Sequence, residues 1–187
     1  MLKGIPKILS PELLKVLCEM GHSDRIVLAD GNFPVETMGK NAKVIRCDGH
    51  GIPELLEAIL ALFPLDTYVE HPVELMEVMP GDPVETPIWE EYKRLIARAD
   101  ERGEAAVGAL ERFAFYEKSK TAYAIVATGE QALYANIMLQ KGVVQKKWLP
   151  LRSAVWEAAG RILTPNASIF FRNGCASSPL PIPSPRR

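Results

Sequence analysis

The feature that most constrains this sequence is an alternation between helix-like segments and short apolar runs of strand length. Ser10 and Pro11 form a typical helix start, because the serine side chain can accept hydrogen bonds from free amides and a proline there loses none. Apolar residues then recur at helical spacing until Gly21, a residue type that commonly ends helices. The apolar run 26–29 follows and predicts a short buried strand. This alternation predicts an α/β layered domain.

The same patterns continue along the chain to about residue 144. Residues 73–79 predict a strand, although Glu74 and Glu77 leave a helix open. The Pro-Gly-Asp-Pro run at 80–83 predicts a loop. The remaining predicted elements are helices at 52–63, 88–98 and 113–120 and strands at 43–47, 122–127 and 133–139.

Charge and proline content change abruptly near residue 145. Residues 1–144 carry 15 Lys and Arg against 22 Asp and Glu, whereas residues 145–187 carry 7 basic residues and one acidic residue. The later segment also holds six of the 15 prolines. A shift of this kind marks a boundary. We therefore predict one domain over 1–144 and a basic, Pro/Ser-containing tail over 145–187 that is largely disordered.

Composition and spacing argue against several classes of protein. No apolar stretch reaches the length of a signal peptide or a membrane span, and the three cysteines lie far apart, which suits a reducing compartment. We therefore expect a cytoplasmic protein without membrane association. An acidic domain has no broad attraction to nucleic acid. The three histidines show no metal-ligand spacing, and no P-loop or dinucleotide fingerprint is present.

Three residues on connections between elements are candidates for chemistry. His22 lies between a helix end and a strand, where α/β folds place reactive groups, and imidazole exchanges protons near neutral pH. A surface histidine that stabilises a helix C-terminus is the alternative interpretation. Asp30, at the end of an apolar strand, and Asp66 can each accept hydrogen bonds from sugar hydroxyls, or can simply stabilise a turn.

Two later segments combine hydrogen-bonding and aromatic side chains. Arg112 and Tyr116 are four residues apart and share a helix face, so they suit a sugar, although an ordinary helix with core aromatics has the same pattern. Tyr134 and Asn136 are two apart on the predicted last strand and are expected to project to the same side. They can bind a ligand or belong to a solvated strand face.

These segments, taken in order, resemble the L-fucose mutarotases, whose wider family includes the D-ribose pyranases. Each motif is short, but the motifs are colinear over residues 1–144. The matching segments are Leu9-Ser10-Pro11-Glu12-Leu13-Leu14, Met20-Gly21-His22, Ala29-Asp30 with Asn32-Phe33-Pro34, Ile45-Arg46, Asp48-Gly49, Leu65-Asp66-Thr67-Tyr68, Arg112-Phe113-Ala114-Phe115-Tyr116-Glu117, Thr128-Gly129-Glu130 and Lys141-Gly142-Val143.

The resemblance implies a three-layer α/β/α single domain that assembles into a ring-shaped homodecamer. It implies an isomerase that interconverts the α- and β-anomers of L-fucose without a cofactor or metal, by opening and reclosing the pyranose ring. It also allows related activity on the pyranose forms of D-ribose. The expected partners are therefore a monosaccharide and further copies of the same chain.

Carried over by position, the resemblance also implies roles for single residues. His22 is the expected proton donor, and the general base is either Tyr116 or a water positioned by Asp30. The residues expected to contact the sugar or line its pocket are Asp30, Asp66, Arg112, Tyr116, Tyr134 and Asn136.

One position departs from the family pattern. Ala135 stands where the family usually has glycine between the tyrosine and the asparagine. A methyl group there would cost activity if the backbone had a positive φ or approached the sugar closely, and would be harmless in an ordinary strand. The alternative function is therefore a catalytically impaired sugar-binding variant.

Overall fold

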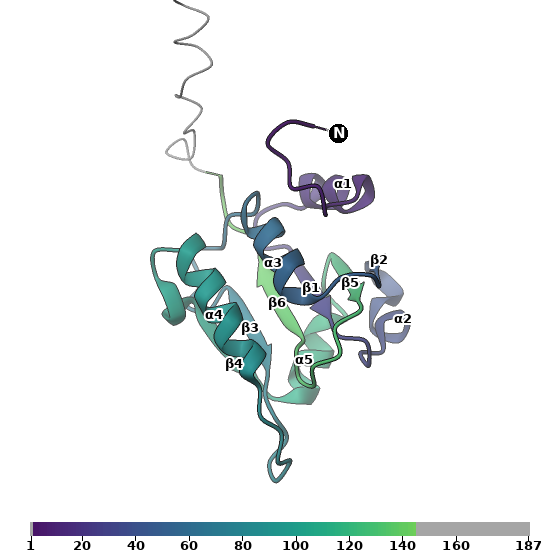
Figure 1. Ribbon diagram of the computed structural model, residues 1–187, viewed down its shortest axis with the longest axis vertical. Coiled ribbons are helices and arrows are strands. Elements are labelled where there is room, and N and C mark those ends of the chain that lie inside the picture. The colour runs from purple at the N-terminus through teal and green to yellow at the C-terminus, as the bar shows by residue number, and fades with distance from the viewer. Residues whose placement is uncertain (1, 145–187) are drawn as a thin grey trace, which may run out of the picture. The chain divides into compact units, whose positions relative to one another are not determined.

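A six-stranded sheet with helices on both faces forms the part of the protein that the structure, a computed structural model, describes, residues 2–144 (Figure 1). The order across the sheet is β2-β5-β1-β6-β3-β4. Strand β6 is antiparallel to β1 and β3, and the other pairs, β1–β5, β2–β5 and β3–β4, are parallel. The strands are β1 Arg25–Ala29, β2 Lys43–Cys47, β3 Val73–Met76, β4 Val107–Leu110, β5 Ala124–Thr128 and β6 Ile137–Gln140.

The helices divide between the two faces of this sheet. Alternate residues of β1 show the division: Ile26 and Leu28 pack with α1, α3 and α4, whereas Val27 and Ala29 pack with α2 and α5. The predicted three-layer α/β/α fold is therefore confirmed. The helices are α1 Pro11–Glu19, α2 Val35–Met38, α3 Ile52–Leu60, α4 Pro87–Ala99 and α5 Arg112–Ser119, with short 3-10 turns η1 Gly39–Asn41 and η2 Gly103–Ala106.

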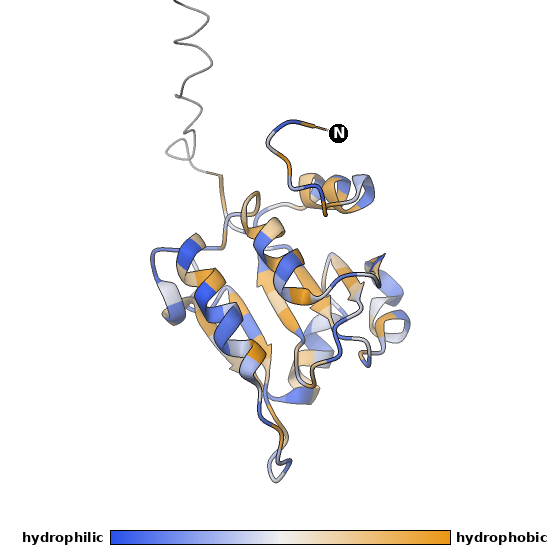
Figure 2. Ribbon diagram, in the orientation of Figure 1, coloured by the Kyte–Doolittle hydropathy of each residue, from blue (hydrophilic) through white to orange (hydrophobic). Residues whose placement is uncertain are grey.

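Burial explains why the central strands have continuous apolar sequences. All four residues from Ile26 to Ala29 are fully buried, because helices cover both faces of β1. Most of β6 has the apolar colour, whereas α3 and α4 alternate apolar and polar residues (Figure 2). The first helix begins as its sequence predicts, with the Ser10 side chain accepting from the Leu13 amide at 3.1 Å.

Several elements differ from the expectation drawn from the sequence. The last strand begins at Ile137 rather than at residue 133, because Tyr134 has a φ of 55° and interrupts the extended backbone. The strand at the start of 73–79 is real but ends at Met76. Strand β4 and helix α2 were not expected; in the Val-Gly-Ala-Leu sequence of β4, Val107 is the one strong strand former.

The predicted tail over 145–187 lies outside the described residues. Within residues 2–144, no helix is both long and apolar enough to cross a membrane. Within the same range, no three His, Cys, Asp or Glu side chains gather in a way that could hold a metal ion.

Gly129, which follows β5, provides a test of the packing at this edge of the sheet. A Cβ there would lie 2.1 Å from the Asp48 carbonyl oxygen. We expect Gly129→Ala to lower the free energy of unfolding by about 1–3 kcal/mol in urea denaturation. Gly49→Ala is the control, since its Cβ would have no neighbour within 4 Å. Equal stability of the two variants would contradict this packing.

Candidate functional site: two groups of polar residues at opposite edges of the sheet

Asp30 and Asn136 form a buried pair where β1 ends and β6 begins. The Asn136 Nδ2 donates to Asp30 Oδ2 at 2.6 Å, and the Asp30 amide donates to Asn136 Oδ1 at 2.9 Å. The Asn32 amide donates to Asp30 Oδ1. Burial raises the pKa of Asp30 above its ordinary value, although these hydrogen bonds oppose the shift. A carboxyl group with a raised pKa beside an open space is suited to proton transfer.

This pair opens into a cavity of about 210 Å³, which we call the Asp30 cavity. The end of β3, the start of α5 and the loops before α4 and β6 complete its wall. Its lining residues are Asp30, Asn32, Phe33, Met76, Asp82, Arg112, Tyr116, Leu133, Tyr134 and Asn136.

Helix α5 presents Arg112 and Tyr116 to this cavity. The Glu111 carboxylate accepts from the amides of Phe113 and Ala114, which fixes the start of the helix at Arg112. Arg112 Nε lies 3.4 Å from the Tyr116 hydroxyl, and its guanidinium lies 5.6 Å from the centre of the tyrosine ring. The predicted pairing of these two side chains on one helix face is therefore confirmed.

The turn that carries Tyr134 is held by helix α4 and by the loop before it. Trp89 Nε1 donates to the Tyr134 carbonyl at 2.8 Å, and the Tyr92 hydroxyl donates to the Ala135 carbonyl at 2.9 Å. The Tyr134 hydroxyl donates to Asp82 Oδ2 at 2.7 Å. Tyr134 and Asn136 thus share the cavity because of this turn, and the expected strand geometry is not the reason.

Ala135 has none of the strain that its departure from the family pattern suggested. The positive φ belongs to Tyr134, and Ala135 is not among the non-glycine residues with positive φ in residues 2–144. Its side chain is fully buried in the core below α4 and does not line the Asp30 cavity. The methyl group is therefore compatible with an intact cavity.

His22 and Asp66 form a second group at the other end of β1. His22 Nε2 lies 3.1 Å from Asp66 Oδ2, and the histidine is 43% exposed whereas the carboxylate is 1% exposed. Asp66 also accepts from the Tyr68 amide at 2.9 Å and from Gln140 Nε2 at 3.0 Å. The Tyr68 ring meets His22 edge to face at 5.4 Å. An exposed imidazole held by a buried carboxylate is a suitable proton donor to a ligand outside this chain.

The hydrogen bonds at Asp66 decide its protonation. Burial raises the pKa of Asp66, but the bonds from Tyr68, Gln140 and His22 together outweigh burial and lower the pKa below its ordinary value. Asp66 is therefore a carboxylate at neutral pH and offers His22 Nε2 a charged partner at 3.1 Å.

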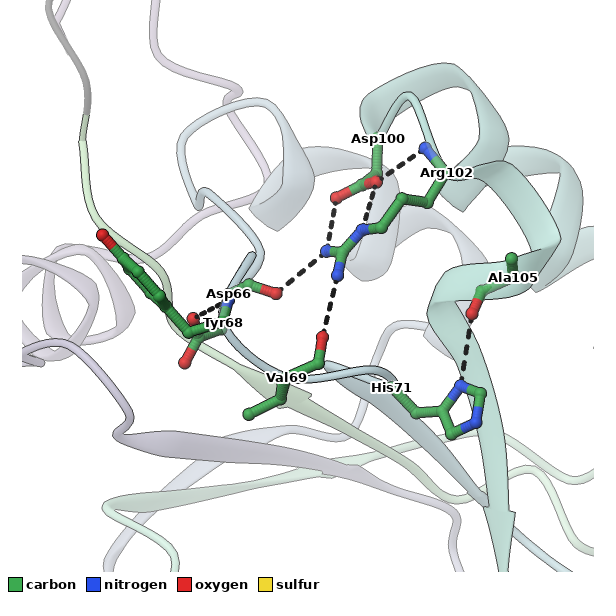
Figure 3. Close-up of polar contacts among 7 residues, drawn as sticks. All are labelled: Asp66, Tyr68, Val69, His71, Asp100, Arg102 and Ala105. Carbon is green, nitrogen blue, oxygen red and sulfur yellow. Dashed lines mark hydrogen bonds and ion pairs between the residues drawn. The ribbon is translucent and has the colours of Figure 1, made fainter.

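Arg102 fixes the loop that carries Asp66 and Tyr68 (Figure 3). Its guanidinium donates to the Asp66 carbonyl and to the Val69 carbonyl, both at 2.9 Å. The Asp100 carboxylate holds the same guanidinium through two further bonds. The loop is therefore tied to the segment after α4.

The structure separates the residues that the sequence groups together. His22 and Asp30 flank β1, whose five residues span roughly 15 Å of extended chain. The five residues Asp30, Arg112, Tyr116, Tyr134 and Asn136 lie at one edge of the sheet, and His22 and Asp66 lie at the other.

Three residues that contact the two groups of site residues were not identified from the sequence. Asp82 lies in a run of turn-forming residues, Gln140 ends an apolar strand, and Tyr68 follows Asp66 in a loop. None of the three had a local pattern that separates a site residue from a solvated one.

A second cavity of about 330 Å³ adjoins Asp30 on the side of β2 and β5. Arg46 and Asp48 line it and pair with each other, and Thr128 bonds to the Ala29 carbonyl. It gathers only Asp30 from the predicted set, so the Asp30 cavity is the stronger candidate.

The fold and the cavity define a small α/β domain with a binding site for one polar molecule. Residues 3–144 match the RbsD / FucU transport protein family, and the chain belongs to this family. It is 54% identical over 147 residues to the fucose mutarotase of Mus musculus. The match covers 76% of this chain and 95% of that protein.

Two solved structures are also similar. FucU from Bifidobacterium longum has 66% identity and a TM-score of 0.75, and the match covers 76% of this chain and all of that chain. The fucose mutarotase from Streptococcus pneumoniae, solved in complex with L-fucose, has 53% identity and a TM-score of 0.71. That match covers 77% of this chain and 100% of the other.

The lowered pKa of Asp66 predicts a pH-dependent contribution to stability. The carboxylate contributes fully above its unfolded-state pKa of about 3.9, and the contribution is lost as pH falls through the folded-state pKa. We expect Asp66→Asn to be less stable than the wild type by about 1.5–3 kcal/mol between about pH 5 and 7. The difference shrinks below about pH 4 in urea denaturation.

The exposed Glu85 provides the control for this titration. Glu85→Gln is expected to follow the wild type within about 0.5 kcal/mol across the same range. If the loss of unfolding free energy in Asp66→Asn instead grew toward acid pH, the direction given for the Asp66 pKa shift would be wrong.

Proposed function

We propose that this protein is a cytoplasmic isomerase that interconverts the α- and β-anomers of L-fucose. The observation that carries the proposal is the gathering of Asp30, Arg112, Tyr116, Tyr134 and Asn136 around one small cavity. The similarity to fucose mutarotases supports it, since one of these relatives was solved with L-fucose bound. Residues 1–144 form the domain that carries this activity.

The lining of the Asp30 cavity suits a deoxy sugar. Asp30 and Asn136 supply a carboxylate and an amide for hydroxyl groups, and Arg112 supplies further donors. Phe33, Met76 and Leu133 add apolar surface to the same cavity. L-fucose has a methyl group on its ring that such surface can cover, and ribose does not. Fucose is therefore the proposed main substrate, and ribose is a poorer one.

The reaction needs only proton transfers at one bound molecule. A base removes the proton of the anomeric hydroxyl, the C1 carbonyl forms, and the bond from C1 to the ring oxygen breaks as an acid protonates that oxygen. Rotation about the C1–C2 bond and closure on the other carbonyl face give the other anomer. His22 is the proposed acid, and Tyr116 or a water held by Asp30 is the proposed base.

The separation of His22 from the Asp30 cavity requires a second copy of the chain. His22 faces outward beside Tyr68, which is 75% exposed, at one edge of the sheet. At the other edge, Leu133, 52% exposed, lines the cavity, and Phe113, 62% exposed, packs against Tyr116 of the lining. We propose that these two edges meet between neighbouring copies. Each site then combines His22 and Asp66 of one copy with the Asp30 cavity of the next.

A contact between two different edges is heterologous, so a repeated contact closes into a ring if the rotation permits. The ring-shaped homodecamer implied by the family resemblance is an assembly of this kind. Asp66 has a different proposed role from the one expected from the sequence. It orients His22 and does not itself contact the sugar, since its carboxylate is 1% exposed.

Anomer exchange measured by saturation-transfer NMR on L-fucose tests the function directly. We expect the wild-type chain to accelerate exchange above the rate in buffer. His22→Ala is expected to lower the rate by about a hundredfold or more, since it removes the acid. His50→Ala is the control, because His50 is a partly exposed histidine that bonds to Glu54 and does not line the Asp30 cavity. A wild-type rate equal to that of buffer would rule out the enzyme.

Mixed assemblies test whether two copies share each site. We expect His22→Ala and Asp30→Asn to be inactive when assembled separately. Equal amounts of the two chains, unfolded and refolded together, should recover about a quarter of the wild-type rate. That fraction follows because one interface in four then joins an intact His22 to an intact Asp30.

A site within one chain gives no recovery on mixing. Each variant refolded alone is the control for losses during refolding. Light scattering of the mixture reports whether the expected ring has formed.

A further inference from the structure

We infer that Lys141 and Arg102 are positioning residues that set the contact between His22 and Asp66. The inference rests on the proposed role of His22 as the acid. Neither cation touches the Asp30 cavity, and each is bonded to the backbone of one of the two loops that meet at this contact.

Lys141 holds the loop that carries His22. Its Nζ donates to the carbonyls of Leu17 and Met20, both at 2.6 Å, at the C-terminal end of α1. Helix C-termini favour a cation, because their last carbonyls have no partner within the helix. The Lys141 carbonyl accepts from the Ser23 amide at 2.8 Å, and the Lys141 amide donates to the Asp24 carbonyl at 2.8 Å. Lys141 is thus bonded to the loop 20–24 before His22, at Met20, and after it, at Ser23 and Asp24.

The hydrogen bonds between Lys141 and this loop hold Ser23 in a backbone conformation that serine does not favour. Its φ is 69°, a left-handed conformation that costs a non-glycine residue of order 1 kcal/mol. The bonds from Lys141 to residues 23 and 24 maintain this conformation, and it determines where the adjacent His22 points. Loss of part of this anchoring therefore lets the loop relax and move the imidazole away from Asp66.

The residue after Lys141 brings the second loop to the first. A Cβ on Gly142 would lie 2.3 Å from the Leu65 carbonyl oxygen and 2.9 Å from the Asp66 Cα. The Gly142 amide donates to the Pro64 carbonyl at 2.8 Å, and the Asp66 amide donates to the Gln140 carbonyl at 3.1 Å. Residues 140–142 therefore lie between the two loops and are bonded to both.

Arg102 holds the Asp66 loop from its other side. Its bonds to the carbonyls of Asp66 and Val69 fix the backbone of this loop, and Asp100 holds the planar guanidinium in the orientation that these bonds need (Figure 3). A planar group that donates to two carbonyls and a carboxylate at once cannot be replaced by lysine or methionine. The His22 side and the Asp66 side of the contact thus each depend on one cation.

The test compares Lys141→Met and Arg102→Met with Lys43→Met in the full-length chain. Lys43 is the matched control, because it also anchors α1, through Glu19, but does not contact the His22 loop. We expect kcat for anomer exchange to fall about ten- to a hundredfold in the first two variants. Their KM is expected to change less than twofold, since the Asp30 cavity lies at the other edge of the sheet. Lys43→Met should stay within about twofold of the wild type in both constants.

A second measurement does not depend on activity. The ring protons of His22 and Tyr68 should give a nuclear Overhauser effect in the wild type and in Lys43→Met, since their ring centres are 5.4 Å apart. The effect should be lost or strongly weakened in Lys141→Met and Arg102→Met. Circular dichroism reports whether each variant is folded. If one of the two variants does not fold, the other still tests the inference.

The outcomes separate this inference from the proposed function. A wild-type chain without activity contradicts the proposed function, and the ring-to-ring signal still tests the positioning. An active wild type whose Lys141→Met and Arg102→Met variants keep kcat and the signal overturns the inference. An equal rise of KM in both variants also overturns it, because that result indicates a general loss of structure.

Discussion

The antiparallel pairing of β6 between β1 and β3 is the interaction on which both groups of site residues depend. Asn136, just before β6, bonds to Asp30 at one edge of the sheet, and Gln140, its last residue, bonds to Asp66 at the other. The register of β6 against β1 therefore fixes both carboxyl groups at once. A slip by one residue would turn every side chain of β6 to the opposite face and separate both pairs.

This arrangement gives the two carboxyl groups opposite electrostatic environments. At Asp30, burial prevails over the hydrogen bonds and raises the pKa, which favours a group that can exchange a proton. At Asp66, the hydrogen bonds from Tyr68, Gln140 and His22 prevail and lower the pKa, which favours a permanent negative charge. Asp66 thus provides a charged, fixed partner for the His22 side chain. In the proposed assembly, the two ends of these strands therefore supply complementary halves of one reaction.

Much of the fold followed from the sequence, because its elements have strong local patterns. The Ser10-Pro11 start of α1, the continuous apolar run of β1 and the Arg112–Tyr116 spacing of α5 were all predicted correctly. The turn at Tyr134 could not be predicted, since its conformation is imposed by distant hydrogen bonds from Trp89 and Tyr92. The separation of His22 from Asp30, by contrast, was implicit in the strand predicted over 26–29 between them. The two residues lie apart because the five extended residues of β1 stand between them.

The backbone conformations of the described residues place strain at both groups. Between residues 2 and 144, the non-glycine residues with positive φ are Ser23 and Tyr134. Ser23 follows His22, and Tyr134 lines the Asp30 cavity. Such conformations persist only where surrounding bonds over-determine them, and they cluster at functional sites. Here the bonds are visible in each case, from Lys141 at Ser23 and from Trp89, Tyr92 and Asp82 at the Tyr134 turn. At these two places, hydrogen bonds hold a backbone conformation that is unfavourable in itself. This is expected if the geometry there serves binding and proton transfer rather than folding.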